Sequence, residues 1–433
     1  MSCFTFYLHP AYNRRIQKDD LMTDFTKFAR RITFVLFVTQ CLVSAGNIAS
    51  ATVNPIVGAK LGGSDYWTGV PTAVYLLGSA FAASAWGYIM DAVGRRNGIV
   101  FGLLIGMFGN AMIWFALQNG SMLMLLAGMA LIGATNAAVV LGRFAAGEVN
   151  PPDKRGGAIS MVVWGGTFGA VFGPLLVGPM GNFVKTFGYD ELAGAYLAAF
   201  VLLAVVSVVL FFGLRPDPRE LGKQIAELYP SSAPAGQSRS LLEIFRQPAA
   251  LIAVTAMVLG QMVMVAIMVI TSRYMNHHQH GLNDIARVIQ AHTVGMYAFS
   301  IISGRLSDKW GRGPVILSGA AMLLLACVTA PLSPDVLPLS VSLFFLGLGW
   351  NFCFVGGSAL LADQLSPLER SRTQGTNDLL VGLASATGSL GSGIVFAATS
   401  YTVITVVAGI LSLVPLVMSL VWMRKRRTVP VAV

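Results

Sequence analysis

The chain has 433 residues, of which 55% are hydrophobic and only 11% are charged, and its mean hydropathy is +0.69. In soluble domains about a quarter of the residues are charged, so this composition excludes an ordinary soluble protein and indicates a membrane protein. The formal net charge of +10 is compatible with nucleic-acid binding, but the positions of the charges, described below, argue against that partner. The four cysteines form no C-x-x-C pair and have no metal-finger spacing. Neither a metal site nor a cofactor is expected.

Apolar runs near the ~20 residues that a helix needs to cross a bilayer recur along the whole chain. They predict an all-α membrane protein with twelve transmembrane helices. The predicted spans are residues 32–57, 66–88, 98–117, 121–146, 157–180, 191–213, 249–272, 285–303, 314–332, 336–361, 374–399 and 402–423.

The basic residues are distributed unevenly between the two sides of the predicted membrane. If the N-terminus is cytoplasmic, 24 of the 29 Lys and Arg residues lie on the inner side and four on the outer side, with Arg143 inside a span. This asymmetry is the positive-inside pattern. It predicts that both termini are cytoplasmic, and it explains the positive net charge by topology, without nucleic acid. No cleavable signal is recognised, and Met22 offers an alternative start that would leave residues 1–21 untranslated.

A ten-residue pattern occurs twice, at residues 87–96 and 304–313, each time between two predicted spans. Both copies contain Gly, then Asp four residues later, then Gly-Arg. The two aspartates, Asp91 and Asp308, are 217 residues apart (308 − 91), half the length of the chain. Two charged hairpins at this offset predict two homologous six-helix halves, as in secondary transporters.

The predicted organisation follows from the hairpins, the spans and the one long polar stretch. The segments are a cytoplasmic N-terminal segment at 1–31, a first half at 32–214, a flexible linker at 215–246 with a surface helix at its end, a second half at 247–423 and a cytoplasmic tail at 424–433.

A second repeat relates the ends of spans 4 and 10, at an offset of 215 residues. The equivalent pairs are Glu148 and Asp363, Arg155 and Arg370, and Asn136 and Asn351 (351 − 136 = 215). An asparagine at the same depth in both halves predicts either a pair of cavity-lining amides or a pair of helix-packing amides.

The doubled G-x-x-x-D-x-x-G-R pattern resembles the loops between helices 2 and 3, and 8 and 9, of the major facilitator superfamily. Residues 165–178 of span 5 resemble the antiporter motif G-x-x-x-G-P-x-x-G-G of its drug exporters, with Val177 in place of one glycine. Close helix packing is the alternative interpretation of these glycines. Arg143 lies too near the inner loop to match the span 4 arginine motif of those exporters, which weakens a multidrug assignment.

The resemblance covers essentially the whole chain and implies alternating access, in which residues 1–214 rock against 247–423. It also implies charge clusters that hold the cytoplasmic gate shut in the outward-open state. Such partly desolvated pairs are stronger than surface pairs and can still be broken. The residues implied are Asp91, Arg95, Glu148 and Arg155 in the first half, and Asp308, Arg312, Asp363 and Arg370 in the second.

The family further implies a central cavity lined by spans 1, 4, 7 and 10. Span 1 carries a polar stripe on one helical face, since its polar residues follow a spacing of about four and seven. Hydrogen bonds between neighbouring helices would explain the same stripe. The candidate lining residues are Gln40, Asn47, Asn136, Gln261, Trp350 and Asn351.

Two embedded ionisable residues are candidates for proton coupling. Asp378, in span 11, has no counterpart in the first half, because position 163 (378 − 215) is a valine. Desolvation in a closing cavity would favour its protonated form, although an acid near a helix start is also stabilised by the helix dipole. His292, in span 8, is the second candidate, unless it donates a hydrogen bond to a helix carbonyl. The nearby tract with His277, His278 and His280 is interpreted as a solvated loop, with metal binding as the less favoured alternative.

The sequence therefore predicts a secondary active transporter of a small organic compound, most simply a proton-coupled exporter. An uptake symporter and an uncoupled facilitator of the same fold are the alternatives. There is no P-loop and no nucleophile arrangement, so an enzyme is not expected. The expected partners are the substrate, protons and the lipid bilayer, with the chain a monomer in a bacterial inner membrane.

Overall fold

The computed structural model describes residues 10–152, 154–228 and 239–427, and every regular element in them is a helix. The first half contains α1 (Pro10–Gly62), η1 (Asp65–Trp67), α2 (Val70–Val93), α3 (Arg95–Asn119), α4 (Met122–Glu148), α5 (Arg155–Phe172), η2 (Pro174–Leu176), α6 (Val177–Lys185) and α7 (Ala193–Gly213). The second half contains α10 (Pro248–His277), α11 (Leu282–Tyr297), α12 (Ser300–Trp310), α13 (Arg312–Thr329), η3 (Ala330–Leu332), α14 (Val336–Ala362), α15 (Pro367–Ala398) and α16 (Tyr401–Arg427).

The helices are long and apolar enough to make a multi-pass membrane protein. Eleven helical segments of the described residues could each cross a bilayer, and the strongly bent α2 makes twelve. Two of the spans are broken. Span 5 changes from α5 to η2 at Gly173 and Pro174, where proline cannot donate the next backbone hydrogen bond, and span 8 breaks between α11 and α12. The predicted twelve-helix architecture is confirmed.

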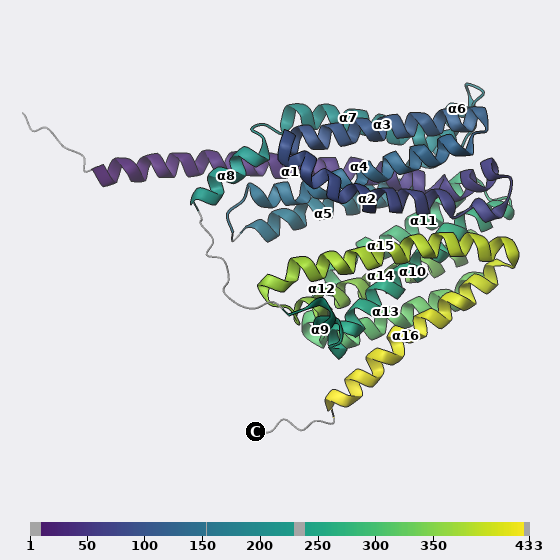
Figure 1. The fold of residues 1–433 in the computed structure, drawn as a ribbon. Helices are drawn as coiled ribbons and strands as arrows, with labels where there is room; N and C mark the ends of the chain where they lie inside the picture. Colours follow the sequence, from purple (N-terminus) through teal and green to yellow (C-terminus); the bar gives the residue numbers. More distant parts are fainter. Residues whose placement is uncertain (1–9, 153, 229–238, 428–433) are drawn as a thin grey trace, which may run out of the picture.

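The two halves repeat the same packing. In the first half α3 packs on α4 and α1 on α5, and in the second half α13 packs on α14 and α10 on α15. Figure 1 shows the two groups of helices lying one above the other, with α15 along the interface. The half-chain repeat in the sequence thus corresponds to a structural repeat.

The linker between the halves is partly ordered. The helix α8 (Pro218–Leu228) packs back onto the first half, where Leu221 and Ile225 are buried. The prediction of a flexible linker from 215 is therefore wrong for this helix, because its strongly amphipathic pattern was missed. The short helix α9 (Leu241–Phe245) forms where a surface helix was expected. The remaining linker residues, 229–238, lie outside the described residues, as do 1–9 of the N-terminal segment and 428–433 of the tail.

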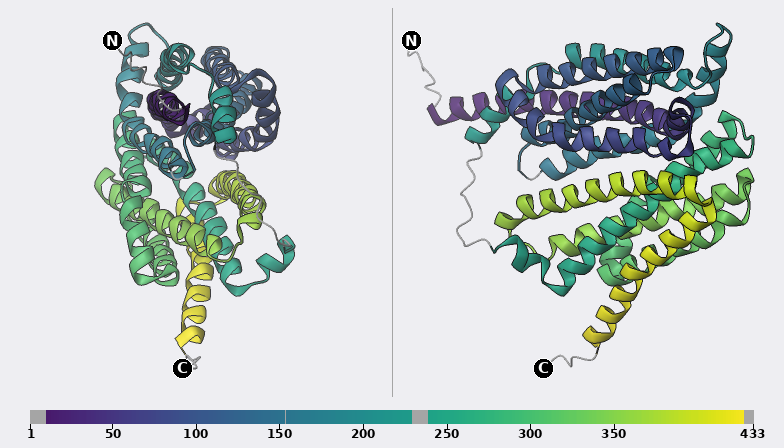
Figure 2. Two further views of the ribbon diagram at one scale, coloured as in Figure 1. Left: turned by 90° about the vertical axis from the view of Figure 1, so that its left-hand side faces the viewer. Right: turned by 45° about the vertical axis from the view of Figure 1, so that its right-hand side comes forward.

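The two ends of the bundle differ in how the halves meet. We call the end with the turns at Gly94 and Gly311 the hairpin end, and the opposite end, with η1 and the α10–α11 turn, the distal end. Both turn glycines have φ near +90° (90° and 91°), which explains why the repeated pattern needs glycine there. The halves contact each other at the distal end, through α15 with η1 and α6 with α11, and they diverge toward the hairpin end (Figure 2).

Candidate functional site

Two adjoining cavities lie at the interface of the halves. The first, which we call the amide cavity, has a volume of about 280 Å³ and is lined by polar side chains of α1, α2 and α4, by small or apolar residues of α5, and by Tyr297 of α11. Its lining residues are Gln40, Ser44, Asn47, Ile48, Tyr75, Asn136, Val140, Arg143, Val163, Gly166, Ala170 and Tyr297.

The second cavity, which we call the methionine cavity, has a volume of about 230 Å³ and is closer to the distal end. It includes residues of both halves, among them Met129 and Ile132 from α4, and Met268 and Met296 from α10 and α11. The two cavities share Asn47, Ile48, Tyr75 and Tyr297, so they adjoin at these residues. A space of this size and mixed polarity suits a small organic molecule.

Four of the predicted lining residues face these cavities. Asn47 donates to the side-chain oxygen of Asn136 (3.3 Å), and Asn136 donates to the hydroxyl of Ser79 (3.2 Å). Gln40 donates to Ser44 (3.2 Å) on the same face of α1. Gln261 lines the methionine cavity from α10. These amides therefore form a hydrogen-bonded wall next to the open space, combining both interpretations of the polar stripe.

The other two predicted lining residues have a packing role. Asn351 is only 3% exposed and donates to the carbonyl of Met296 (2.7 Å) and to Ser300 (2.9 Å), where α11 breaks into α12. Trp350 donates its indole N–H to Gln261 and stacks on Phe354. The asparagine repeat of spans 4 and 10 thus has two functions, since Asn136 lines a cavity and Asn351 holds a helix break.

Asp378 lies on α15 in the part that faces the first half. Its side chain is exposed, and its charge interacts with that of Arg143, which projects from α4 into the wall of the amide cavity. Arg143 also has no counterpart in the other half, because position 358 (143 + 215) is a serine. Each half therefore contributes one unmatched charge, and the fold places the two within electrostatic range of each other. The sequence could not reveal this partner, which is 235 residues away (378 − 143).

His292 is completely buried between α11 and α14. Its Nδ1 atom lies 3.0 Å from the carbonyl oxygen of Leu343, and its Nε2 atom has no hydrogen-bond partner among the described residues. This is the packing arrangement that the sequence had left open as the alternative. His292 lines neither the amide nor the methionine cavity.

The charge cluster of the first hairpin is held within its own half. Arg95 contacts both oxygens of Glu148 (2.8 and 3.1 Å) and one oxygen of Asp91 (2.7 Å). Asp217, just before α8, accepts hydrogen bonds from the backbone N–H groups of Arg95 and Arg96 at the start of α3. A carboxylate at a helix N-terminus satisfies free donors and is favoured by the helix dipole.

The second hairpin repeats this cluster with fewer contacts. Arg312 binds Asp308 (2.6 Å) and Asp363 (3.1 Å). The two remaining predicted arginines lie at the edges of the clusters. Arg155 donates to the backbone carbonyl of Asn150 (3.2 Å), and Arg370 is exposed at the start of α15. In this conformation both clusters are internal to one half, and no ion pair among the described residues joins them.

An ionic contact between the halves lies at the distal end, where the sequence analysis had not placed one. Asp65 of η1 accepts a hydrogen bond from Arg273 of α10 (2.7 Å), and the imidazole of His277 lies 3.2 Å from its other oxygen. Nearby, Ser389 of α15 donates to the carbonyl of Gly69 (2.7 Å). The only sequence signal was that Arg273 is one of the few basic residues on this side. The described residues contain no group of three or more His, Cys, Asp or Glu side chains that could bind a metal.

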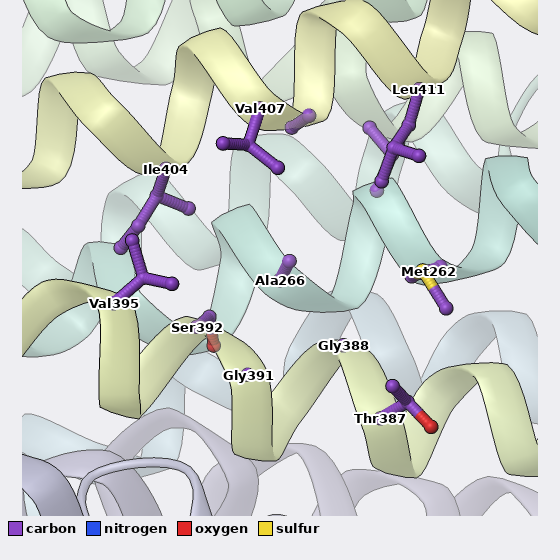
Figure 3. A pocket seen from close by; sticks show the side chains of 12 residues that line it. Met262, Ala266, Thr387, Gly388, Gly391, Ser392, Val395, Ile404, Val407 and Leu411 are labelled. Carbon is purple, nitrogen blue, oxygen red and sulfur yellow. The ribbon is translucent and has the colours of Figure 1, made fainter.

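A third cavity, of about 190 Å³, lies inside the second half between α10, α15 and α16. Its wall is almost entirely aliphatic, with Thr387 and Ser392 as the polar exceptions (Figure 3). Because it lies within one half and carries no charged side chain, it is not part of the space between the halves.

Comparison with known proteins agrees with this geometry. The family model of the Major Facilitator Superfamily matches residues 36–292 and 285–433. The chain belongs to this superfamily. It is therefore a transporter and not an enzyme. An MFS-type transporter of Bacillus subtilis (strain 168), YdeG, is 35% identical over 92% of this chain and 93% of its own length.

Other relatives carry a substrate in their names. The riboflavin transporter RfnT of Brucella anthropi is 29% identical over 83% of this chain and 87% of its own length. The multidrug resistance protein MdtL of Escherichia coli is 33% identical, but over only 18% of this chain and 20% of its own. Among solved structures, a bacterial homologue of the human lysosomal transporter Spinster, in an inward-facing conformation, has a TM-score of 0.68 at 15% identity, covering 91% of this chain and 97% of that one.

The glycines of the exporter-like motif in this superfamily member pack mainly against α1. A side chain at Gly165 or Gly169 would collide with the backbone of Phe37 or Cys41. Gly178, at the end of the motif, instead lies against Asn283 of α11 in the other half. The motif thus combines close packing within one half with one contact across the interface.

Proposed function

We propose that the chain couples the movement of a small organic compound to protons, and that Asp378 carries the proton. The observation that supports this most strongly is the pair of unmatched charges, Asp378 and Arg143, which come from different halves and lie within electrostatic range of each other, with Arg143 in the wall of the amide cavity. An ionisable residue inside a membrane is costly and points to function. His292 is the weaker candidate, because it is buried away from the cavities.

We further propose that the hairpin end is cytoplasmic, as the distribution of Lys and Arg favours. The distal contacts would then seal the outer side, and compounds would enter the amide cavity from the cytoplasm. A reporter fused after Val433 should be cytoplasmic, and one inserted near His278 should be external. Finding both on one side of the membrane would overturn this topology.

Export is the direction that the span 5 motif favours, since it resembles that of proton-driven exporters and Gly178 reaches the interface. Uptake by proton symport is the second candidate. It is supported by the likeness to a riboflavin transporter over most of the chain. Riboflavin is therefore the first compound to test.

The test uses purified chain in proteoliposomes, with riboflavin and a panel of small organic compounds offered under inward and outward pH gradients. Export coupled to protons predicts that substrate and proton move in opposite directions, and symport predicts the same direction. If the transport rate does not depend on the pH gradient, proton coupling is wrong and the chain is an uncoupled facilitator.

The role of Asp378 is tested in the same vesicles. Asp378→Asn should abolish substrate-driven proton movement and retain substrate binding, whereas His292→Gln should lower the rate and leave coupling intact. If Asp378→Asn vesicles still move protons on addition of substrate, Asp378 is not the carrier.

A further inference from the structure

Arg143 is a cation in the membrane-spanning part of the chain that has no salt bridge within 4 Å among the described residues. It is partly buried, and its Nε atom is shielded from solvent with no hydrogen-bond partner. A shielded, unsatisfied guanidinium donor costs free energy. The nearest ring, that of Phe144 at 4.9 Å from the guanidinium carbon, compensates only weakly.

The surroundings of Arg143 form a binding site, because it shares the amide cavity with Gln40, Asn47 and Asn136. No carboxylate lines this cavity, and Asp378 is the acid whose charge reaches Arg143 from the other half. An arginine with free donors in a cavity suits a planar anion such as a carboxylate, or a phosphate. The amides would add hydrogen bonds to such a group.

The adjoining methionine cavity suits a different part of the same molecule. Methionine and branched aliphatic side chains of both halves line it and can adapt to an apolar body. Two hydroxyls in its wall, Ser50 and Thr72, belong to side chains that are 4% and 8% exposed, and neither has a hydrogen-bond partner. They are available to polar atoms on that body.

We propose that the substrate is an amphipathic organic anion, with its acidic group on Arg143 in the amide cavity and its apolar part beyond Tyr75 and Tyr297. This inference names the substrate class of the proposed transport function. Anion binding at Arg143 is independent of that function, and only the identification of the anion as the transported substrate rests on it. The bound anion would compete with Asp378 for the charge of Arg143. Asp378 would then be free to take a proton while the anion is bound, so for an anionic substrate this arrangement favours the symport candidate over proton-driven export.

The experiment measures the thermal stability of the purified full chain with matched pairs of compounds, each an aromatic carboxylic acid and its uncharged amide. Benzoate with benzamide and nicotinate with nicotinamide are such pairs, and riboflavin 5′-phosphate with riboflavin is added as a phosphate with its uncharged parent alcohol. The acids should stabilise the chain at concentrations about 10-fold lower than the amides, because charge-assisted hydrogen bonds are the stronger ones. If no acid exceeds its amide, the inference is wrong.

Arg143→Gln should abolish the preference for acids, and Arg143→Lys should restore part of it. The matched control is Arg287→Gln, which removes an exposed distal arginine that pairs with Asp284 and should keep the preference. If Arg143→Gln, with an unchanged melting temperature in the absence of compounds, still prefers the acids, Arg143 is not the anion site. A further experiment adds phosphatidylglycerol to nanodiscs that hold the chain. If this lipid abolishes the thermal stabilisation by the acids, a lipid phosphate occupies the site and the substrate assignment is wrong.

The outcomes for the two proposals are separable. Loss of acid binding in Arg143→Gln with retained binding in Asp378→Asn supports the anion site whatever the coupling. Loss of proton coupling in Asp378→Asn supports the proton carrier even when the amides bind as well as the acids.

Discussion

The two ends of this transporter use charged residues in different ways. At the distal end, Asp65 binds Arg273 across the interface, so this contact must break when the halves separate there. At the hairpin end, Arg95 and Arg312 bind acids of their own halves. The charges of the repeated hairpins therefore stabilise each half as a unit in this conformation, and the distal contacts hold the two units together.

This difference bears on the gate that the family resemblance implied. The hairpin clusters were expected to hold the cytoplasmic gate shut in the outward-open state, and that role remains a proposal. In the present conformation the clusters face the diverging hairpin end without crossing it. Among the acids of the clusters, Asp91 and Asp308 are the most exposed, at 69% and 76%, so they are the best placed to form new contacts when that end closes.

The largest effect is expected from Gly69, which lies against the backbone of the other half at the distal end. A methyl group on Gly69 would lie 1.7 Å from the carbonyl oxygen of Ser389, so Gly69→Ala should prevent distal closure and lower transport by about 10-fold or more. Spin labels at Asn119→Cys and Leu332→Cys, on exposed distal ends of the two halves, should move apart. Gly391→Ala on α15 is the control, since a methyl group there meets nothing within 4 Å. Equal behaviour of the two variants would contradict the distal seal.

A smaller effect is expected from the ionic contact. Asp65→Asn leaves Arg273 and His277 without their acid, and breaking this partly buried pair should shift the equilibrium away from distal closure by about 1–3 kcal/mol. The same spin-label distance reports the shift. Asp190→Asn is the matched control, because Asp190 pairs with Lys60 inside the first half. If the control shifts the equilibrium equally, the effect comes from the loss of any acidic charge at the distal end and not from the Asp65–Arg273 pair between the halves.

The two hairpin clusters should differ in their contribution to stability. Arg95 binds both oxygens of Glu148, which is 33% exposed, whereas Arg312 binds one oxygen of Asp363, which is 49% exposed. Arg95→Gln should therefore lower the free energy of unfolding by about 1–2 kcal/mol, and Arg312→Gln by less than about 1 kcal/mol. Thermal unfolding in one detergent measures both losses of stability. If Arg312→Gln destabilises the chain as much as Arg95→Gln or more, the predicted difference between the two clusters is wrong.

The smallest effect on stability is expected from Asp91 and Asp308. Their exposed pairs contribute about 0.5 kcal/mol or less, so Asp91→Asn and Asp308→Asn should insert and unfold almost as the parent does. Transport should nevertheless be impaired, because each acid would lose a contact made only when the hairpin end closes. Full transport activity in both single variants would remove these acids from the gate.

The sequence by itself determined the features that depend on neighbouring residues. Twelve spans follow from apolar runs of membrane length, and the two halves follow from a repeated pattern whose glycines are needed for the positive-φ turns at Gly94 and Gly311. The clusters around Arg95 and Arg312 were also foreseeable. Their members recur at constant offsets and lie beside the same turns.

Only the tertiary structure decided which distant side chains meet. Asn136 and Asn351 are equivalent in sequence, yet Asn136 lines a cavity and Asn351 donates hydrogen bonds at the break in span 8. Arg143 and Asp378 come within electrostatic range of each other although they lie on two non-equivalent helices, α4 and α15, of different halves. Helical periodicity predicts the face of a residue on its own helix, but the partner of that face depends on how whole helices pack.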